Sequence, residues 1–331
     1  MDMENMNLQD VPQTEVAAVE VQQPAPQNPE KKQKIRNKMK KSKSDVTFDI
    51  VNYSILTLAF IIFIYPLIYV ISASMTKPTD VLSGKMWLFP TSFSFEGYAR
   101  ILSYAPLWQS FLNTIYIVVV GTVLSIIVTL LAGYVLSRDD FKAKKFFILV
   151  FTVTMFFGGG LIPYYMLITE TLNMRDTLWA LIIPSAVSVY NIILVKTYFT
   201  TSLPKDIFEA ALIDGCGDFK FFVSIATPLA VPIIAVIALY NVVGKWNSYF
   251  DALIFLNSES KYPLQLVINN LLMENDVSSV SGSGSLSLEH ALVVESMKYG
   301  VIVVASLPML VVYPMVQQYF IKGIMVGSVK G

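Results

Sequence analysis

The chain has 331 residues, of which 54% are hydrophobic and 15% are charged, and its 24 basic residues balance its 24 acidic ones. The charged fraction lies well below the roughly 25% of soluble domains, which excludes an ordinary soluble protein. With Cys216 as the one cysteine and His290 as the one histidine, the chain offers no disulfide, no cysteine-rich metal site and little histidine-based catalysis. The composition is typical of a protein that crosses a membrane several times, and we expect no catalytic residue and no metal site.

Residues 1–45 differ in composition from the rest of the chain. Pro, Gln, Val and Glu are followed by a run of basic residues between Lys31 and Lys43. Such a segment buries too little apolar surface to fold, so we predict a disordered cytoplasmic tail. The first apolar run begins too late and is too long for a signal peptide. Basic residues directly before a membrane span indicate contact with anionic lipids and a topology signal, and they do not indicate nucleic-acid binding.

Six apolar stretches follow, each close to the roughly 20 residues that a helix needs to cross a bilayer. They cover residues 52–74, 111–136, 146–168, 177–199, 228–244 and 299–321. Backbone groups in hydrocarbon must be paired within a helix or a closed barrel, and the two-residue alternation of barrel strands is missing. We therefore predict an all-α membrane bundle of six transmembrane helices over residues 46–331. The apolar run WNSYFDALIFL after Lys245 either extends the fifth span or re-enters the protein.

Lysine and arginine predict the orientation of the spans. With the N-terminus inside, the inner side collects the basic tail and the bases that follow the second span. The outer side holds fewer, among them Lys77, Lys245 and Lys261. We expect a multi-pass cell-membrane protein with both termini in the cytoplasm. Of the two long outer segments, 75–110 contains aromatic residues that suit an interfacial helix, and 245–298 contains a Ser/Gly tract that should be mobile.

A charged, glycine-containing segment at about residues 202–227 separates the fourth and fifth spans on the predicted inner side. Pro204 and Asp206 favour the start of a short helix, and Asp214-Gly215 favours a sharp turn because glycine adopts a positive φ. A second short helix follows. The pair is too small to form a core, so its apolar residues must pack against the span ends or against another protein. Spacing alone leaves open that the segment is a solvated connecting loop.

The sequence EAALIDGCGDFKFFVSIATPLAVP resembles the EAA motif of ABC-importer permeases. The matching positions are Glu209, Ala210, Ala211, Asp214, Gly215, Phe222, Ile225 and Pro228, and Cys216 replaces a common alanine. NTIYIVVVGTVLSIIVTLLAGYVLSRDDF resembles the carbohydrate-uptake permeases that are similar to the shorter maltose-permease subunit. TMFFGGGLIPYYMLI and WALIIPSAVSVYNIILVKTYF resemble the complex-polysaccharide and lipoprotein-named subgroup more narrowly. The resemblance covers roughly residues 50–331.

This resemblance implies a permease subunit for sugars, with oligosaccharides as the expected cargo. It implies a heterodimer with a second permease subunit, a dimer of ATPase subunits and an extracellular sugar-binding lipoprotein. The EAA segment would be a coupling helix, in which Glu209 pairs with a basic ATPase residue, Asp214 fixes the turn, and Ala210, Ala211 and Gly215 let the surfaces meet. The chain has no GxxxxGK[ST] loop, so we expect no cofactor in this subunit, with ATP and Mg bound by the ATPase.

Polar residues within the spans are candidates for the substrate path, because they are costly in lipid. These residues are Asn113, Ser185, Ser188, Tyr190, Asn191, Tyr240 and Asn241, together with Trp246 and Asn247 near the outer end of the fifth span. Hydrogen bonding between helices is the alternative role for each of them. Gly158–Gly160 predict a weak point in the third span, which serves either as a gating hinge or as a close helix contact. An ion-gradient-driven secondary transporter is the alternative function, but it would require inverted repeats and charged residues at mid-membrane.

Overall fold

The computed structural model describes residues 42–280, 292, 294–295 and 297–314. The chain divides into two compact units, residues 1–58 and 59–331, which are described separately. In the first unit the described residues belong to helix α1 (Lys43–Ser74), which continues into the second unit. The predicted disordered tail lies outside the described residues up to residue 41. Its last three residues, 43–45, are instead the first turn of α1.

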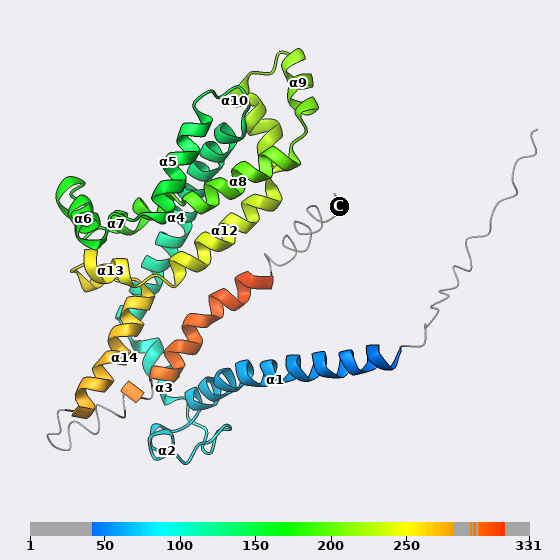
Figure 1. The fold of residues 1–331 in the computed structure, drawn as a ribbon. Coiled ribbons are helices and arrows are strands. Elements are labelled where there is room, and N and C mark those ends of the chain that lie inside the picture. The colour runs from blue at the N-terminus through cyan, green and yellow to red at the C-terminus, as the bar shows by residue number, and fades with distance from the viewer. Residues whose placement is uncertain (1–41, 281–291, 293, 296, 315–331) are drawn as a thin grey trace, which may run out of the picture. The chain divides into compact units, whose positions relative to one another are not determined.

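The described part of the second unit consists of helices and loops, with one isolated β-bridge between Thr76 and Phe93. After α1 come α2 (Pro78–Leu82), α3 (Glu96–Ser103), α4 (Ala105–Ser137), α5 (Lys144–Phe156), α6 (Leu161–Met166), η1 (Leu167–Thr171), α7 (Trp179–Ile182), η2 (Pro184–Ala186), α8 (Val189–Ser202), α9 (Lys205–Ile213), α10 (Asp218–Phe221), η3 (Phe222–Ala226), α11 (Thr227–Leu229), α12 (Val231–Trp246), α13 (Phe250–Phe255), η4 (Glu259–Lys261) and α14 (Leu264–Val280). An unlabelled helix, Met297–Pro314, ends the described chain (Figure 1). The prediction of an all-α protein is confirmed.

The predicted spans correspond to helices, except that residues 315–321 of the sixth lie outside the described residues, and three of the spans are bent. α1, α4 and Met297–Pro314 are each long and apolar enough to cross a membrane. The other three are pairs of helices, Lys144–Phe156 with Leu161–Thr171, Trp179–Ala186 with Val189–Ser202, and Asp218–Leu229 with Val231–Trp246. The described residues therefore contain three helices that could span a membrane by length and composition, and up to six spans if each bent pair counts as one.

The sharpest bend, 113°, falls at the glycines of the third predicted span. Gly160 has a φ of +85°, which only glycine adopts without strain. An added Cβ at Gly158 or Gly159 would meet nothing within 4 Å. Among the described residues these glycines therefore lie at a sharp bend and make no close helix contact, and their role as a gating hinge stays a prediction.

Helix α4 lies at the centre of the second unit, where α8, α12 and α14 pack against it (Figure 1). Small residues allow this close approach. At Gly133 an added Cβ would come within 2.5 Å of Val195 Cγ1 and 3.1 Å of the Lys196 backbone nitrogen on α8. Thr122, Ser125 and Thr129 are also buried on α4. Small and hydroxyl-bearing side chains are typical of helix contacts within membranes.

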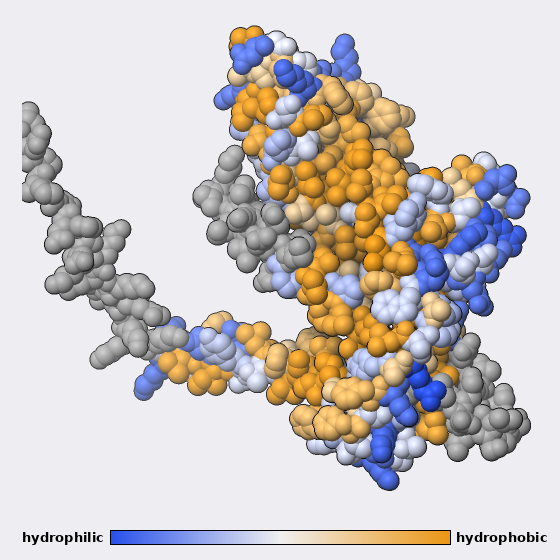
Figure 2. Space-filling view, turned by 180° about the vertical axis from the view of Figure 1, so that it is seen from behind, coloured by the Kyte–Doolittle hydropathy of each residue, from blue (hydrophilic) through white to orange (hydrophobic). Residues whose placement is uncertain are grey.

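Large apolar side chains remain exposed over much of the surface. The most apolar window of α1 has none of its residues buried, against 39% for that of α4 and 22% for that of Met297–Pro314. Figure 2 shows a broad continuous band of hydrophobic side chains, in orange, over the drawn face. Water-soluble proteins rarely expose patches of this extent, whereas a lipid bilayer covers them. This surface agrees with a protein that crosses the membrane several times.

Three expectations for the predicted outer segments are wrong in whole or in part. The aromatic residues Trp87, Phe89 and Phe93 are exposed on the loop between α2 and α3, not on an interfacial helix, because Gly84 and Pro90 interrupt helical geometry. The start of the Ser/Gly tract, up to Val280, belongs to α14, and the tract from residue 281 lies outside the described residues. Lys245, expected in an outer loop, lies in the last turn of α12 and is only 8% exposed.

Candidate functional site

A cavity of about 400 Å³ lies among α4, α7, α8, α12 and α13. It is lined by Ile117, Leu181, Ser185, Ser188, Tyr190, Asn191, Tyr240, Asn241, Gly244, Lys245, Ser248, Asp251 and Pro263. Its volume falls in the usual range of small-molecule sites, and most of the residues that line it are polar or charged. Six of the nine polar residues that the sequence suggested for the substrate path line this one cavity, although they come from two predicted spans.

The polar side chains in this cavity differ in whether hydrogen bonds within the protein already use their polar atoms. Ser188 caps α8 by accepting a hydrogen bond from the Asn191 backbone nitrogen at 3.4 Å. Asn241 donates to the Ile237 carbonyl of its own helix at 3.0 Å. Tyr190 and Tyr240 are each about half exposed, and within the described residues no hydrogen bond occupies either hydroxyl. The tyrosines are therefore the polar groups most available to a ligand that stacks and hydrogen-bonds.

The other three predicted path residues lie outside the cavity. Trp246 is buried between α4 and the helix Met297–Pro314, where its Nε1 donates to the Ala305 carbonyl and its ring meets Phe111. Asn247 is exposed and donates to the Val243 carbonyl. Asn113 donates to the carbonyls of Ser260 and Tyr262 at 2.8 and 3.1 Å. Asn113 thus follows the alternative role, hydrogen bonding between elements.

Sequence reasoning missed both charged groups of the cavity. Lys245 was assigned to an outer loop, and Asp251 lies in the run WNSYFDALIFL, whose course the sequence left open. The structure shows that this run re-enters the protein as α13, which packs against α7 through the buried Ala252 and Phe255. The only sequence signal was the charge of Lys245 and Asp251 within otherwise apolar stretches.

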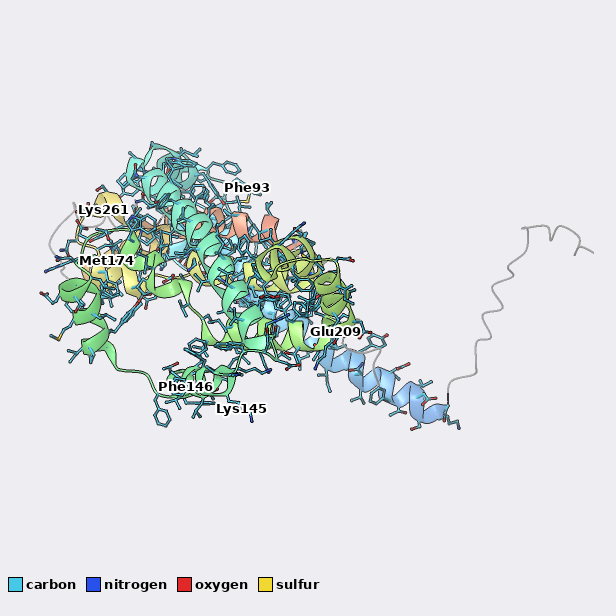
Figure 3. The ribbon with its side chains drawn as sticks, turned by 90° about the horizontal axis from the view of Figure 1, so that it is seen from above. Phe93, Lys145, Phe146, Met174, Glu209 and Lys261 are labelled. Atoms are coloured by element: carbon cyan, nitrogen blue, oxygen red, sulfur yellow. The ribbon has the colours of Figure 1, made fainter. Side chains whose placement is uncertain are left out.

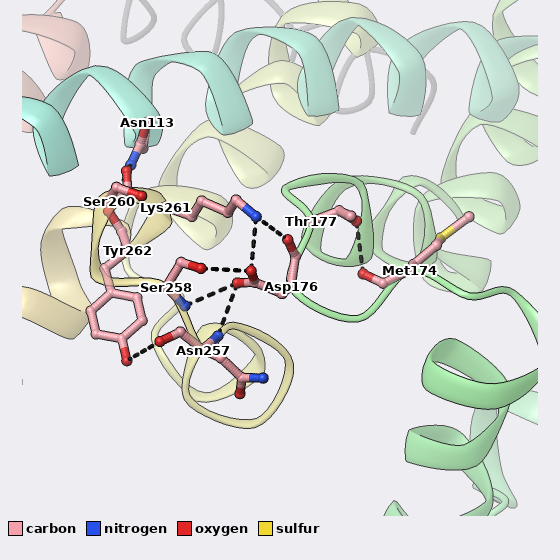
Figure 4. A network of polar contacts seen from close by, with 9 residues as sticks. All are labelled: Asn113, Met174, Asp176, Thr177, Asn257, Ser258, Ser260, Lys261 and Tyr262. Atoms are coloured by element: carbon pink, nitrogen blue, oxygen red, sulfur yellow. Dashed lines mark hydrogen bonds and ion pairs between the residues drawn. The ribbon is translucent and has the colours of Figure 1, made fainter.

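A polar clasp around Asp176 holds α13 in place (Figure 4). Asp176 Oδ1 accepts hydrogen bonds from the backbone nitrogens of Asn257 and Ser258, and Oδ2 accepts from Ser258 Oγ and Lys261 Nζ at 2.6 and 2.8 Å. The Asp176 backbone nitrogen donates to the carbonyl of Phe255, the last residue of α13, at 2.8 Å. Lys261 and these hydrogen bonds hold the pKa of the Asp176 carboxyl well below its usual value.

The segment of residues 202–227, called here the coupling segment, is the second candidate site. α9 ends at Asp214, and Gly215 takes a φ of +74°. The backbone nitrogen of Gly215 donates to Leu212, and that of Cys216 donates to Ala211. This is a Schellman motif, in which glycine supplies the left-handed residue that ends the helix. The predicted helix–turn–helix is present, and the backbone at Gly215 makes its turn.

The coupling segment has a buried side and an exposed side. Ala211 and Phe221 are buried against Tyr134 and Phe199 at the ends of α4 and α8, and Phe222 and Ile225 pack on the same cluster. Glu209 and Ala210 are exposed, as are the apolar residues Leu212, Ile213 and Phe219, at 60%, 86% and 76%. Asp214 and Pro228 are also exposed. The motif residues therefore divide into those that attach the segment to the bundle and those that face outward.

Arg138, at the end of α4, joins both helices of the coupling segment. Its guanidinium carbon lies 3.5 Å from the ring centre of Phe208 on α9, and its NH2 group lies 3.6 Å from Asp218 of α10. It also donates two hydrogen bonds to Asp140. Nearby, Lys205 of α9 pairs with Asp139 at 2.6 Å, and Lys205 together with Lys144 lowers the pKa of that carboxyl to about 2. These groups line a second cavity of about 540 Å³.

The coupling segment and the Asp176 clasp lie far apart along the bundle. Figure 3 shows Glu209 well separated from Met174 and Lys261, and Figure 1 places α9 near one end of α4 and α13 further along that helix. The cavity lies beside α13, next to the clasp. One end of the second unit therefore carries an exposed helix–turn–helix, and a polar cavity lies toward the other.

Comparisons with known proteins identify similar sequences and a similar structure. The family described as binding-protein-dependent transport system inner membrane component matches residues 143–326. The polygalacturonan/rhamnogalacturonan transport system permease protein of Bacillus subtilis (strain 168) is 38% identical over 86% of this chain and 98% of its own length. The arabinooligosaccharides transport system permease protein of Halalkalibacterium halodurans is 29% identical over 82% of this chain and 94% of its own length.

A solved structure has the same fold over most of the chain. It is a crystal structure of a bacterial ABC transporter involved in the import of the acidic polysaccharide alginate. The similarity has a TM-score of 0.77 and 32% sequence identity, and it covers 85% of this chain and 99% of the other. The helical arrangement described above therefore occurs in a transporter.

Proposed function

Because the chain belongs to the family of binding-protein-dependent transport system inner membrane components, we propose that it forms half of the path by which an ABC importer carries oligosaccharides into the cell. The chain is a multi-pass membrane permease, that is, a transport subunit and not an enzyme. Family membership excludes the alternative of a secondary transporter driven by an ion gradient. The cargo is proposed from the relatives, whose names refer to polygalacturonan and rhamnogalacturonan, to arabinooligosaccharides and to the acidic polysaccharide alginate.

The outward face of the coupling segment is the observation that carries the proposed mechanism. Leu212, Ile213 and Phe219 expose apolar side chains on an element that is otherwise attached firmly to the bundle, and Glu209 adds a negative charge beside them. An apolar patch with a charged neighbour is typical of a protein interface. The partner is a dimer of ATPase subunits, which binds ATP and Mg, and Glu209 pairs with a basic residue on it. Arg138 keeps the two short helices in one orientation, so that ATPase movement reaches α4 and α8 as a rigid-body motion.

The remaining partners and the orientation follow from the same proposal. A second permease subunit completes the path, and an extracellular sugar-binding lipoprotein delivers the substrate. Both termini lie in the cytoplasm, with the basic tail on anionic lipids and the coupling segment on the same side. The cavity then opens toward the outer half of the membrane. Its exposed Tyr190 and Tyr240 supply the aromatic faces and hydroxyls that bind sugars.

Variants of the coupling segment test this mechanism. We expect Glu209→Lys and Ile213→Asp to reach the membrane in normal amounts, because both side chains are exposed and support no core. Each should lower co-purification of the ATPase and substrate uptake by about tenfold or more, since central interface residues commonly contribute over roughly 1.4 kcal/mol. Glu209→Asp and Ile213→Leu are the matched controls. Normal ATPase association and normal uptake in the two disruptive variants would show that docking takes place elsewhere.

A further inference from the structure

The cavity contains a buried cation without a direct counter-ion. Lys245 lies in the last turn of α12, and only 8% of its surface is exposed. Its Nζ lies 2.6 Å from the Oγ and 3.2 Å from the carbonyl oxygen of Ser185. Among the described residues, no carboxylate forms an ion pair with it within 4.0 Å. Transfer of an ammonium group out of water is costly unless an anion compensates for it.

The position of this ammonium group is fixed from two sides. A Cβ added at Gly121 of α4 would lie 2.8 Å from Cε, 2.9 Å from Cδ and 3.2 Å from Nζ of Lys245. Gly121 therefore provides the groove in which the lysine side chain runs, and Ser185 holds its end. An ammonium group has three donors, and Ser185 occupies two of them. The third is available at the cavity that Lys245 lines.

Asp251 is the other charged residue of the cavity lining. It lies on α13, and it does not form an ion pair with Lys245 within 4.0 Å. The cavity thus has a cationic position and a separate anionic one. A ligand that carries a carboxylate and several hydroxyls matches both, because its carboxylate can bind the ammonium group while its hydroxyls donate to Asp251. A second carboxylate near Asp251 would be repelled, which fixes the direction in which such a ligand lies.

Resting on the proposed function in carbohydrate import, we propose that Lys245 binds the carboxylate of an acidic sugar during its passage. The transported class is then oligosaccharides that contain uronate residues. Tyr190, Tyr240 and Asn191 contact the sugar rings and hydroxyls, and Gly121 and Ser185 position the cation. A neutral sugar offers Lys245 only a hydroxyl, which forms a weaker hydrogen bond than the charge-assisted one of a carboxylate.

The competing role of Lys245 is purely structural, as a link between α12 and η2 through Ser185. A structural link affects every substrate equally, whereas a carboxylate-binding residue affects only charged ones. Uptake of trigalacturonate and trimannuronate is therefore compared with uptake of their methyl esters, which have nearly the same size without the charge. The ratio of acid uptake to ester uptake is measured in cells that carry the whole transporter, once with the native chain and once with the Lys245→Met variant. Since the binding protein is the same in both, the change in this ratio isolates the effect of Lys245.

We expect the acid-to-ester ratio to fall by about 10- to 100-fold in Lys245→Met for at least one of the uronates. In Asp251→Asn the cation remains, so the ratio should stay the same or rise. If Lys245→Met does not accumulate in the membrane, Lys245→Gln and Ser185→Ala provide the same comparison. Two results would overturn this inference but leave the proposed function standing. One is an unchanged ratio in the Lys245 variants, and the other is ATP-dependent uptake of the neutral trisaccharide raffinose without uptake of either uronate. Absence of ATP-dependent uptake of all these sugars would overturn the proposed carbohydrate function itself.

Discussion

At the scale of single residues, the motif positions of the coupling segment have distinct physical roles. Ala211 is buried in the cluster that also contains Phe221, whereas Glu209 and Ala210 are exposed. Glycine is needed at position 215 because of the backbone conformation there. An added Cβ would meet nothing within 4 Å, so only the φ of +74° disfavours a side chain. Asp214 caps α9 after its last residue, Ile213, and the backbone hydrogen bonds of Gly215 and Cys216 close the turn at the predicted Asp214-Gly215 pair.

Gly215→Ala tests this backbone role. A left-handed conformation costs an alanine roughly 1–2 kcal/mol, so the turn should loosen and uptake should fall several-fold at normal membrane abundance. Gly217→Ala is the matched control, because Gly217 also has free space around it but has an ordinary φ of −69°. Equal uptake by the two variants would show that the conformation of Gly215 does not matter for transport.

At the scale of elements, the sequence predicted which segments are helical better than it predicted their course. Hydropathy identifies α4 within a few residues, and Gly158–Gly160 indicate the break in the third span. The 78° bend before α12 also has a local cause, since prolines 228 and 232 lie on either side of it. The clasp between Asp176 and Ser258–Lys261 was not predictable, because its partners are some 80 residues apart in the sequence and no local pattern joins them.

The Asp176 clasp predicts a stability difference that depends on pH. Asp176→Asn keeps the shape but loses the charge that Lys261 and Ser258 bind, so the free energy of unfolding should fall by about 1–2 kcal/mol. Because the folded pKa is lowered, this contribution is complete above the ordinary value of about 4 and is lost as the pH falls below it. Thermal unfolding in detergent should therefore separate the two proteins equally from about pH 5 to about pH 8 and less below about pH 4. A separation that grows as the pH falls would contradict this assignment.

At the scale of the whole molecule, the second unit carries two candidate sites at different places along one bundle. The coupling segment lies at one end of α4, and the polar cavity lies toward the other beside the clasp. The sequence predicted the helix–turn–helix of the coupling segment, because its residues are consecutive and its turn is local, and the coupling role stays a prediction. It predicted the cavity in part, because polar residues within spans are recognisable, but it could not show which of them converge. Lys245 was misplaced because a charge near a span end gives no information on its depth.

The central claim is that this chain transports its substrate only when a partner ATPase hydrolyses ATP. The most direct measurement is uptake of a labelled uronate trisaccharide by cells in two conditions. In one, ionophores collapse the ion gradients, and in the other, the phosphate-binding lysine of the ATPase is replaced. We predict that uptake survives the loss of ion gradients while ATP is maintained, and that it stops with the inactive ATPase. Continued uptake with the inactive ATPase would contradict the account.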